Sequence, residues 1–326
     1  NLTSISIPDS VTHIGDEAFR SCGLRELMMP GNVLSFGYAA FRSCYYLTNV
    51  TINAGVTSIW IYGFDGCSNI KTVSIPDSVT SIGTAAFNNC GLTSVMISDS
   101  VTNLGASAFR YCHSLTNITL GSGITSIGQE TFFNCGFKNI SIPDSVTNLN
   151  YRAFYGCSNL ENIKMGSGIT SIGQETFFNC GLTNVIFGAG VDNIGGHAFA
   201  LCAELTSIEI PDTVTVIESN AFYRSGLTEI VIGTGLAELQ GSALSDCFEL
   251  ASITVDNANP YYSSSNDVIF NKSQTELVVY ADGKTNSTYI IPDGVTTIDV
   301  RAFDDCTNLT SIVIPDTVAM IGESAF

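Results

Sequence analysis

Cysteine is the residue type of this chain with the most evident chemical potential, since eleven are present. Cysteines can form disulfides or ligate zinc, but no C-x-x-C pair occurs and their number is odd. Each lies three residues after a phenylalanine or, once, after Leu244. Free cysteine packs as a small hydrophobic residue, so the pattern predicts a column of buried thiols, with oxidation between neighbours as the alternative. The cysteines are residues 22, 44, 67, 90, 112, 135, 157, 180, 202, 247 and 306.

A duplicated stretch is the second candidate for chemistry. "GSGITSIGQETFFNCG" occupies residues 121–136 and again 166–181. Its glycines do not form a dinucleotide fingerprint, because Ser126 stands where the last glycine is needed and no long helix is expected after it. Glu130 and Glu175 would lie roughly 10 Å apart at strand spacing, near the range for inverting glycosidases. Both precede a core phenylalanine on the outer side of a turn, where no cleft is expected. We interpret the stretch as structural.

The histidines do not complete a catalytic set. His13, His113 and His197 fall at three different repeat positions, and successive ones are four repeats apart, about 19 Å at strand spacing. No metal site or Ser/His/Asp triad can be assembled from them. The sequence therefore predicts no catalytic residue, no cofactor and no enzymatic activity.

Pairs of turn aspartates leave one metal alternative open. Asp77 with Asp99, and Asp293 with Asp316, take matching positions in adjacent repeats and would bring carboxylates within about 5 Å of each other. Calcium prefers such oxygen ligands. Aspartate is also a favoured turn residue after a strand, and this is the interpretation we adopt; the prediction is no metal site.

The repeat itself accounts for most of the sequence. Phenylalanine recurs at 19, 41, 64, 87, 109, 132, 154, 177, 199 and 222, in steps of 22 or 23 residues, and again at 303 and 326. One unit reads "TVSIPDSVTSIGTAAFNNC" (72–90). A chain with a period of this length builds a solenoid, because one unit cannot bury its own apolar face and must stack on the next.

Each part of the unit has a structural explanation. Val73 and Ile75 alternate with polar residues, which predicts a short strand with one buried face, and the proline that follows ends it. A second apolar pair includes Ile82, after which Gly83 is expected to permit a tight bend. The "AAF" that ends at Phe87 closes the turn with a small residue against a large ring.

The consensus C-x-x-L-T-x-I-x-I-P-D-S-V-T-x-I-G-x-x-A-F resembles the BspA-like (Treponema pallidum-type) leucine-rich repeat of bacterial and protozoan surface proteins. The match runs over residues 1–326. The resemblance implies a β-rich solenoid with short parallel strands on a concave face, and turns or short 3₁₀ segments on the convex face. We expect one domain of about 13 units, with an extended unit at about 253–292 in which 268–270 and 276–280 form a β-hairpin. Both ends fall inside a unit and no polar cap is visible, so a longer parent protein is expected.

The net charge of the chain limits the kinds of partner that it can bind. Thirty acidic residues against twelve Lys and Arg give a net charge of −18, which repels nucleic acid and anionic membrane surfaces. No apolar run approaches the roughly 18–20 residues that span a bilayer.

The expected binding surface is the concave sheet, which carries the outward strand residues. It is mostly hydroxyl and amide with apolar spots, and suits a protein or glycan; the alternative is that these residues only stabilise the strands. An aromatic patch on the turn side is a second candidate, with packing on a neighbouring unit as its alternative. The candidates are Met28, Thr51, Met96, Thr119, Lys164, Ile186, Glu209 and Val231 on the sheet, and Tyr38, Tyr46, Trp60 and Tyr62 in the patch.

The resemblance also implies a function, because some members of the family resemble matrix-binding adhesins. We expect a non-enzymatic adhesion domain at a cell surface or in a secreted protein, binding proteins or glycans. A passive spacer, and the targeting arm of a larger secreted enzyme, remain the alternatives.

Overall fold

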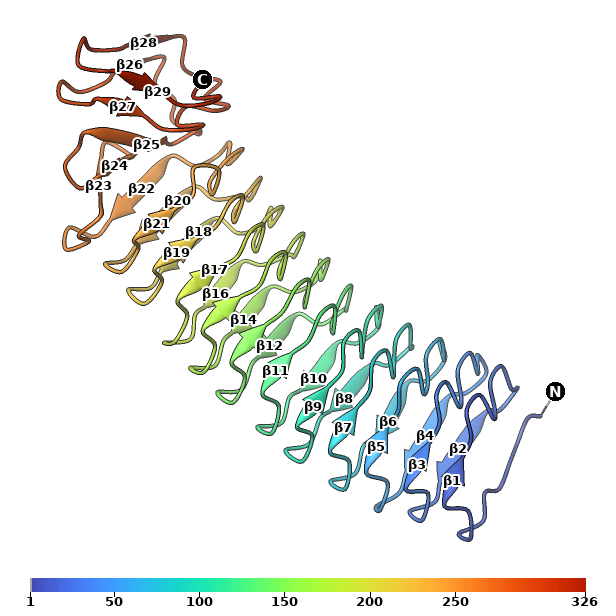
Figure 1. Cartoon of the computed structure of the whole chain (residues 1–326). Helices are drawn as coiled ribbons and strands as arrows, with labels where there is room; N and C mark the ends of the chain where they lie inside the picture. The colour runs from blue at the N-terminus through green and yellow to red at the C-terminus, as the bar shows by residue number, and fades with distance from the viewer. Residues whose placement is uncertain (1) are drawn as a thin grey trace. The chain divides into compact units, whose positions relative to one another are not determined.

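A computed structural model describes residues 2–326 (Figure 1). The chain divides into two compact units: the first ends at Ile169 and the second is Thr170–Phe326. Each unit is a parallel β-solenoid, the chain holds about 13 turns, and no described residue is helical. The predicted solenoid is therefore confirmed. Each regular turn after the first contributes two short strands, one to each of two ladders.

The first ladder holds the strands that begin each turn. In the first unit these are β2 (Glu26–Met29), β4 (Asn49–Ile52), β6 (Thr72–Ser74), β8 (Ser94–Met96), β10 (Asn117–Thr119), β12 (Asn139–Ser141) and β14 (Asn162–Lys164). In the second unit they are β16 (Asn184–Ile186), β18 (Ser207–Ile210), β20 (Glu229–Ile232), β22 (Ser252–Val255), β26 (Thr288–Ile290) and β28 (Ser311–Val313).

The second ladder is made of two-residue strands that follow the proline turn. In the first unit these are β1 (His13–Ile14), β3 (Ser35–Phe36), β5 (Ser58–Ile59), β7 (Ser81–Ile82), β9 (Asn103–Leu104), β11 (Ser126–Ile127) and β13 (Asn148–Leu149). In the second unit they are β15 (Ser171–Ile172), β17 (Asn193–Ile194), β19 (Val216–Ile217), β21 (Glu238–Leu239), β27 (Thr297–Ile298) and β29 (Met320–Ile321).

Alternation decides which side chains enter the core. In β2 and β4 the pairs Leu27–Val50 and Met29–Ile52 are in register and buried, while the residues between them face outward. The inward Ile82 is fully buried, as predicted. Since the strand side chains alternate between faces, every turn adds one inward set to the core and one outward set to the surface.

Phenylalanine rings form a continuous stack under the turns. In the first unit successive rings lie 5.2–5.8 Å apart between centroids and are nearly parallel. Stacked rings of this kind contribute beyond the area they bury. The stack consists of Phe19, Phe41, Phe64, Phe87, Phe109, Phe132 and Phe154.

The expected turns are present on the side opposite the first ladder, and no described residue is in a 3₁₀ helix. Left-handed backbone at two positions of most turns explains this, for example at Ala85 (φ 52°) and Asn89 (φ 53°). That conformation costs a non-glycine residue about 1–2 kcal/mol. It aims amides at the next turn: the Ala85 N–H donates to the Ala106 carbonyl at 2.9 Å, and the Phe87 N–H to the Ala108 carbonyl at 2.8 Å.

Gly83 is needed for a reason that the sequence did not suggest. Its φ is not in the left-handed region. A Cβ at this position would lie 2.7 Å from the Ile61 nitrogen and 2.9 Å from the Trp60 carbonyl carbon. The glycine is therefore required by the close approach of the preceding turn, and not by a bend of its own backbone.

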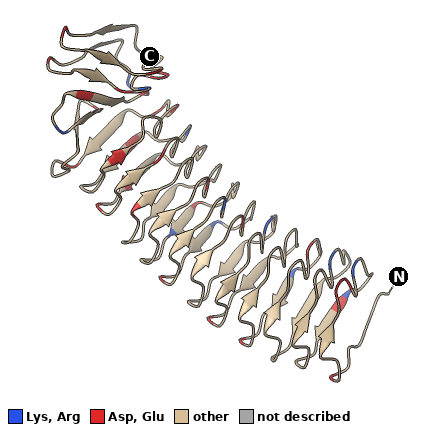
Figure 2. Cartoon of the chain, in the orientation of Figure 1, with Lys and Arg blue, Asp and Glu red and all other residues tan. Residues whose placement is uncertain are grey.

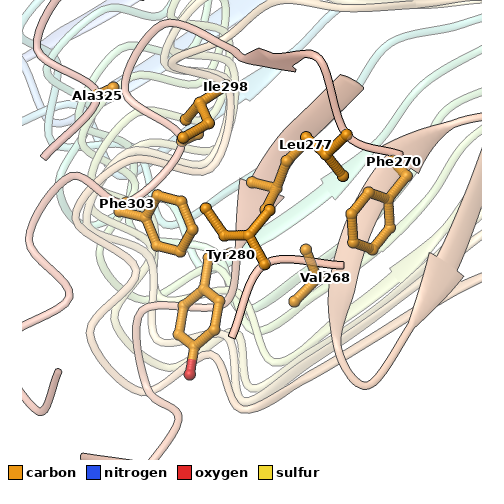
Figure 3. Close-up of a cluster of buried hydrophobic side chains, with 10 residues drawn as sticks. Val268, Phe270, Leu277, Tyr280, Ile298, Phe303 and Ala325 are labelled. Carbon is orange, nitrogen blue, oxygen red and sulfur yellow. The ribbon is translucent and has the colours of Figure 1, made fainter. Parts of the chain in front are cut away.

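The extended unit contains the predicted hairpin and one strand more. β24 (Val268–Asn271) and β25 (Glu276–Tyr280) are antiparallel, and β25 continues the second ladder by pairing in parallel with β27. The additional strand, β23 (Tyr262–Ser265), pairs antiparallel with β24. Val268, Phe270, Leu277 and Tyr280 from the hairpin pack with Phe303 in one buried cluster (Figure 3).

Candidate functional site

The outward residues of the first ladder form an exposed row, which we call the strand face. Met28 and Met96 expose 66% and 69% of their surface. Met28 is in register with Thr51, and Thr119 with Met96. The positions that the repeat predicted as one row are therefore neighbours within the first unit. That row consists of Met28, Thr51, Ser74, Met96, Thr119, Ser141 and Lys164.

The strand face is hollowed over β4, β6 and β8. A groove of about 410 Å³ lies there, and its lining includes Thr51, Ser74 and Met96 from the row. Asn49, Asp77 and other polar residues line it as well, together with the apolar residues Val50, Val73, Ile75 and Val95. Of the apolar residues in the lining only Met96 is exposed. The groove therefore offers hydroxyls, amides and a carboxylate around one exposed, flexible apolar side chain. Methionine adapts its shape to irregular partners, and the polar groups can orient a ligand through hydrogen bonds.

Threonines beside the row have a structural role. The Thr48 hydroxyl donates to the Arg25 carbonyl at 3.0 Å, and the Thr116 hydroxyl donates to the Thr93 carbonyl at 3.2 Å. These bonds join consecutive turns across the surface. For this column the structural alternative raised by the sequence holds, because each hydroxyl is already engaged with backbone.

Two of the turn-side aromatic residues are in contact. The Tyr38 and Tyr62 rings meet edge to face at 5.5 Å, and the Arg42 guanidinium lies 5.2 Å from the Tyr62 ring centroid. Tyr46 (64% exposed) and Trp60 (42%) make no ring–ring contact with any described aromatic residue. A binding patch of all four residues stays a prediction.

In the second unit the strand face carries a glutamate and exposed aliphatic residues. Glu209 is in register with Val231, and Val231 with Thr254. Ile186 exposes half of its surface. Sequence reasoning passed over Ile290, which is 71% exposed on β26. The hairpin interrupts the 22–23-residue period before β26. The spacing of the phenylalanines therefore does not identify Ile290 as an outward position.

Acidic charge is concentrated in the second unit. The first unit has eight Lys and Arg and ten Asp and Glu, a net charge of −2. The second has four and twenty, a net charge of −16. Figure 2 shows red residues along the second unit and few blue ones. The overall value of −18 concealed this division.

The cysteine column is a structural feature. All eleven thiols are free, and nine are buried. Most of the thiols donate to a phenylalanine carbonyl, as Cys67 does to Phe41 at 3.1 Å and Cys112 to Phe87 at 3.2 Å. Cys306 instead donates to the Asp282 carboxylate at 3.8 Å. Burial raises the pKa of Cys112 to about 12, so the reactive thiolate is scarce. The predicted column of buried thiols is confirmed.

The other sequence candidates for chemistry also have structural partners. Glu130 pairs with the Arg110 guanidinium at 3.0 Å on the turn side. The His13 Nδ1 lies 3.0 Å from the Ser35 hydroxyl on the adjacent turn. These contacts hold successive turns together, in agreement with a structural interpretation of the duplicated stretch.

Turn aspartates accept backbone hydrogen bonds from the next turn. The Asp99 carboxylate accepts from the Ser122 N–H at 2.7 Å, which holds the pKa of Asp99 below its usual value. Asp144 accepts in the same way from Ser167. Such bonds give Asp99 and Asp144 a structural role in joining consecutive turns.

Sequence reasoning missed one carboxylate cluster. Asp246, Asp304 and Asp305 place oxygens within 4.8 Å of one another. The Arg224 Nε lies 2.7 Å from Asp246 and supplies a counter-charge. A hydrogen bond to Asp246 raises the pKa of Asp305 to about 6. The sequence separation of these residues hid the cluster, since only the hairpin unit brings them together.

Comparison with known proteins identifies relatives of the whole chain. The family model described as "BspA type Leucine rich repeat region" matches residues 1–114, 80–205, 192–276 and 276–326. A leucine-rich repeat protein from Bacteroides ovatus ATCC 8483 is 24% identical; the match covers 97% of this chain and 79% of that one, with a TM-score of 0.74.

Two further solved structures are similar. A leucine-rich repeat protein from Eubacterium ventriosum ATCC 27560 is 25% identical over 59% of this chain and 51% of its own, with a TM-score of 0.54. A leucine rich cell surface protein from Faecalibacterium prausnitzii A2-165 is 30% identical over 78% of this chain and 79% of its own, with a TM-score of 0.48. The curated proteins gave no match. No helix of the described residues is long and apolar enough to cross a membrane.

Proposed function

Because the chain belongs to the BspA-type leucine-rich repeat family, we propose that it is a non-enzymatic binding domain of a cell-surface or secreted protein. Its partner is a protein or a glycan, and the strand face of the first unit holds it. The resemblance of the repeat to that of bacterial surface proteins supports the location. The same resemblance supports adhesion as the biological role.

The groove over β4, β6 and β8 is the observation that carries this proposal. It lies on the row of outward residues, and Met96 exposes 69% of its surface beside it. Methionine is over-represented at adaptable binding surfaces, and here it is surrounded by hydroxyl and amide groups. Protein and glycan partners both match such a mixture of modest polar contacts and one apolar anchor.

A binding screen tests the proposal. The purified protein is presented to extracellular-matrix proteins, mucins and glycans at about 0.15 M salt, where long-range charge effects are screened. We expect a saturable partner with a Kd in the micromolar range or below. Met28→Glu with Met96→Glu should weaken that binding about tenfold or more, equivalent to 1.4 kcal/mol.

Met320→Glu is the matched control, because Met320 is also exposed (60%) but lies on β29 in the second ladder. It should bind as the wild type does. Unchanged binding by a folded Met28→Glu/Met96→Glu protein would contradict a site on this face.

A passive spacer is the second candidate, and the threonine hydroxyls that bond to neighbouring turns favour it. A face used only for stability should tolerate the methionine substitutions and give no partner in the screen. A folded protein that binds nothing would support the spacer.

A further inference from the structure

Four glutamates of the second unit lie on, or next to, three neighbouring strands of its strand face. Glu209 is on β18 and Glu229 on β20. Glu204 precedes β18 and Glu249 precedes β22, each directly before a buried leucine. All four are exposed. We call these four residues, together with Val231, the acidic face.

These carboxylates have no internal partner. None of the four carboxylates takes part in a hydrogen bond or ion pair with any described residue, although the backbone of Glu209 and Glu229 belongs to the strand ladder. Other acids of the same unit do: Glu218 accepts from the Gly196 N–H at 2.9 Å, and Asp212 accepts from the Thr234 N–H at 2.7 Å. The acidic face therefore has charge that the fold itself does not use.

No basic side chain of this part of the chain can neutralise the face. Arg224 is the only Lys or Arg between residues 170 and 251, and its guanidinium is paired with Asp246 at 2.7 Å. Like charges on adjacent strands repel one another. A cationic partner removes that repulsion and gains attraction from every carboxylate, so the charge of the face specifies the charge of its partner.

The four carboxylates are spread out and do not converge on one point. Ser207 is in register with Glu229, and Glu209 with Val231, so the two glutamates occupy diagonal positions on adjacent strands, where neighbours lie roughly 7–8 Å apart. Among the described residues, the acids whose ligand atoms converge are Asp246, Asp304 and Asp305, and none of these glutamates is among them. Charges spread over three strands match a partner that carries several cations in a row.

We propose that the acidic face of the second unit binds a segment of a partner protein rich in lysine and arginine. The ammonium and guanidinium groups pair with the glutamates. Val231, which is 39% exposed and in register with Glu209, receives the aliphatic stems of the basic side chains. This inference rests on the proposed function and adds a second contact region, separate from the groove of the first unit.

The test uses the whole chain and a lysine-rich peptide, with a peptide that has glutamate in place of each lysine as the negative probe. We expect saturable binding of the lysine-rich peptide that weakens as salt rises. Glu209→Gln with Glu229→Gln should weaken it about tenfold, or 1.4 kcal/mol. Asp293→Asn with Asp316→Asn is the matched control. Both residues are exposed acids of the same unit that lie outside the acidic face, and their carboxylates make no hydrogen bond or ion pair with a described residue. This double variant should change affinity less than twofold.

Any of the following outcomes overturns the proposal. Equal losses in the two double variants would show that net charge alone attracts the peptide. If the folded protein does not bind the lysine-rich peptide, a basic partner is excluded. The first unit offers Arg25, Lys71 and Lys164 as exposed cations, so a second copy is a further possible occupant. Self-association of the wild type in light scattering that Glu209→Gln/Glu229→Gln abolishes would overturn an external partner in favour of a dimer.

The experiments distinguish a failure of the acidic-face proposal from a failure of the proposed function of the first unit. The Met28→Glu/Met96→Glu protein retains the whole acidic face, so it should bind the lysine-rich peptide like the wild type. If that variant loses the peptide as well, the two units do not bind separately and this inference is wrong. If it loses only the matrix or glycan partner, both statements stand.

Discussion

Asn259 is the side chain on which the junction between the regular turns and the hairpin depends most. It is fully buried. Its Nδ2 donates to the carbonyls of Gly233 (3.0 Å) and Leu236 (3.1 Å), and its Oδ1 accepts from the N–H groups of Tyr261 (2.8 Å) and Tyr262 (2.9 Å). One amide thus satisfies four backbone groups where the repeat is interrupted.

Asn259→Asp changes almost no volume but removes the two donors. The carbonyls of Gly233 and Leu236 lose their partners, and an unpaired buried acceptor costs about 1–3 kcal/mol. Two such acceptors give a loss of about 4 kcal/mol, before any further cost of placing a carboxylate beside them. Since 1.4 kcal/mol is a factor of ten, local opening should become several hundredfold more frequent.

Hydrogen exchange followed by mass spectrometry measures this opening. Amides of residues 259–280 should exchange several hundredfold faster in Asn259→Asp at pH 7, while peptides of the first unit stay unchanged, because repeat proteins open locally. Asn257→Asp is the matched control, since the Asn257 side chain is exposed and makes no hydrogen bond. Equal exchange in the two variants would refute the reasoning.

Two further predictions concern titration and thiols. Burial raises the pKa of Asp282 to about 8 from 3.8, so the folded state retains a proton that the unfolded state has lost; stability should fall between pH 4 and pH 8 by up to about 1.4 kcal/mol per pH unit. Urea unfolding of Asp282→Asn should show a flatter profile, and an unchanged slope would contradict the assignment. Native protein treated with a thiol reagent should label first at the partly exposed Cys22, and rapid labelling of Cys112 would show that the column is open.

Local pattern predicted the repeating part of the fold. Period-two alternation placed Val73 inward, and the 22–23-residue period placed Met28 and Met96 in the same row. Both inferences rest on residues close together in one turn, or at matching positions of adjacent turns. The thiol column followed for the same reason.

Features that depend on other turns escaped prediction. The steric need for Gly83 comes from the backbone of the preceding turn. The extra strand β23 carries "YSSS", which has little apolar alternation to mark it. The groove depends on side-chain packing across three strands, and periodicity reports only which residues share a face.

The central claim is that the strand face of the first unit makes contact with the partner, and the five methionines test it directly. Met28, Met96 and Met320 are exposed, whereas Met29 (0%) and Met165 (3%) are buried. Oxidation by peroxide follows exposure, so the buried pair should react slowly with or without a partner. With the partner found in the screen, we predict slower oxidation of Met28 and Met96 and no change at Met320. Equal oxidation of Met28 and Met96 in the free and bound protein would contradict the account.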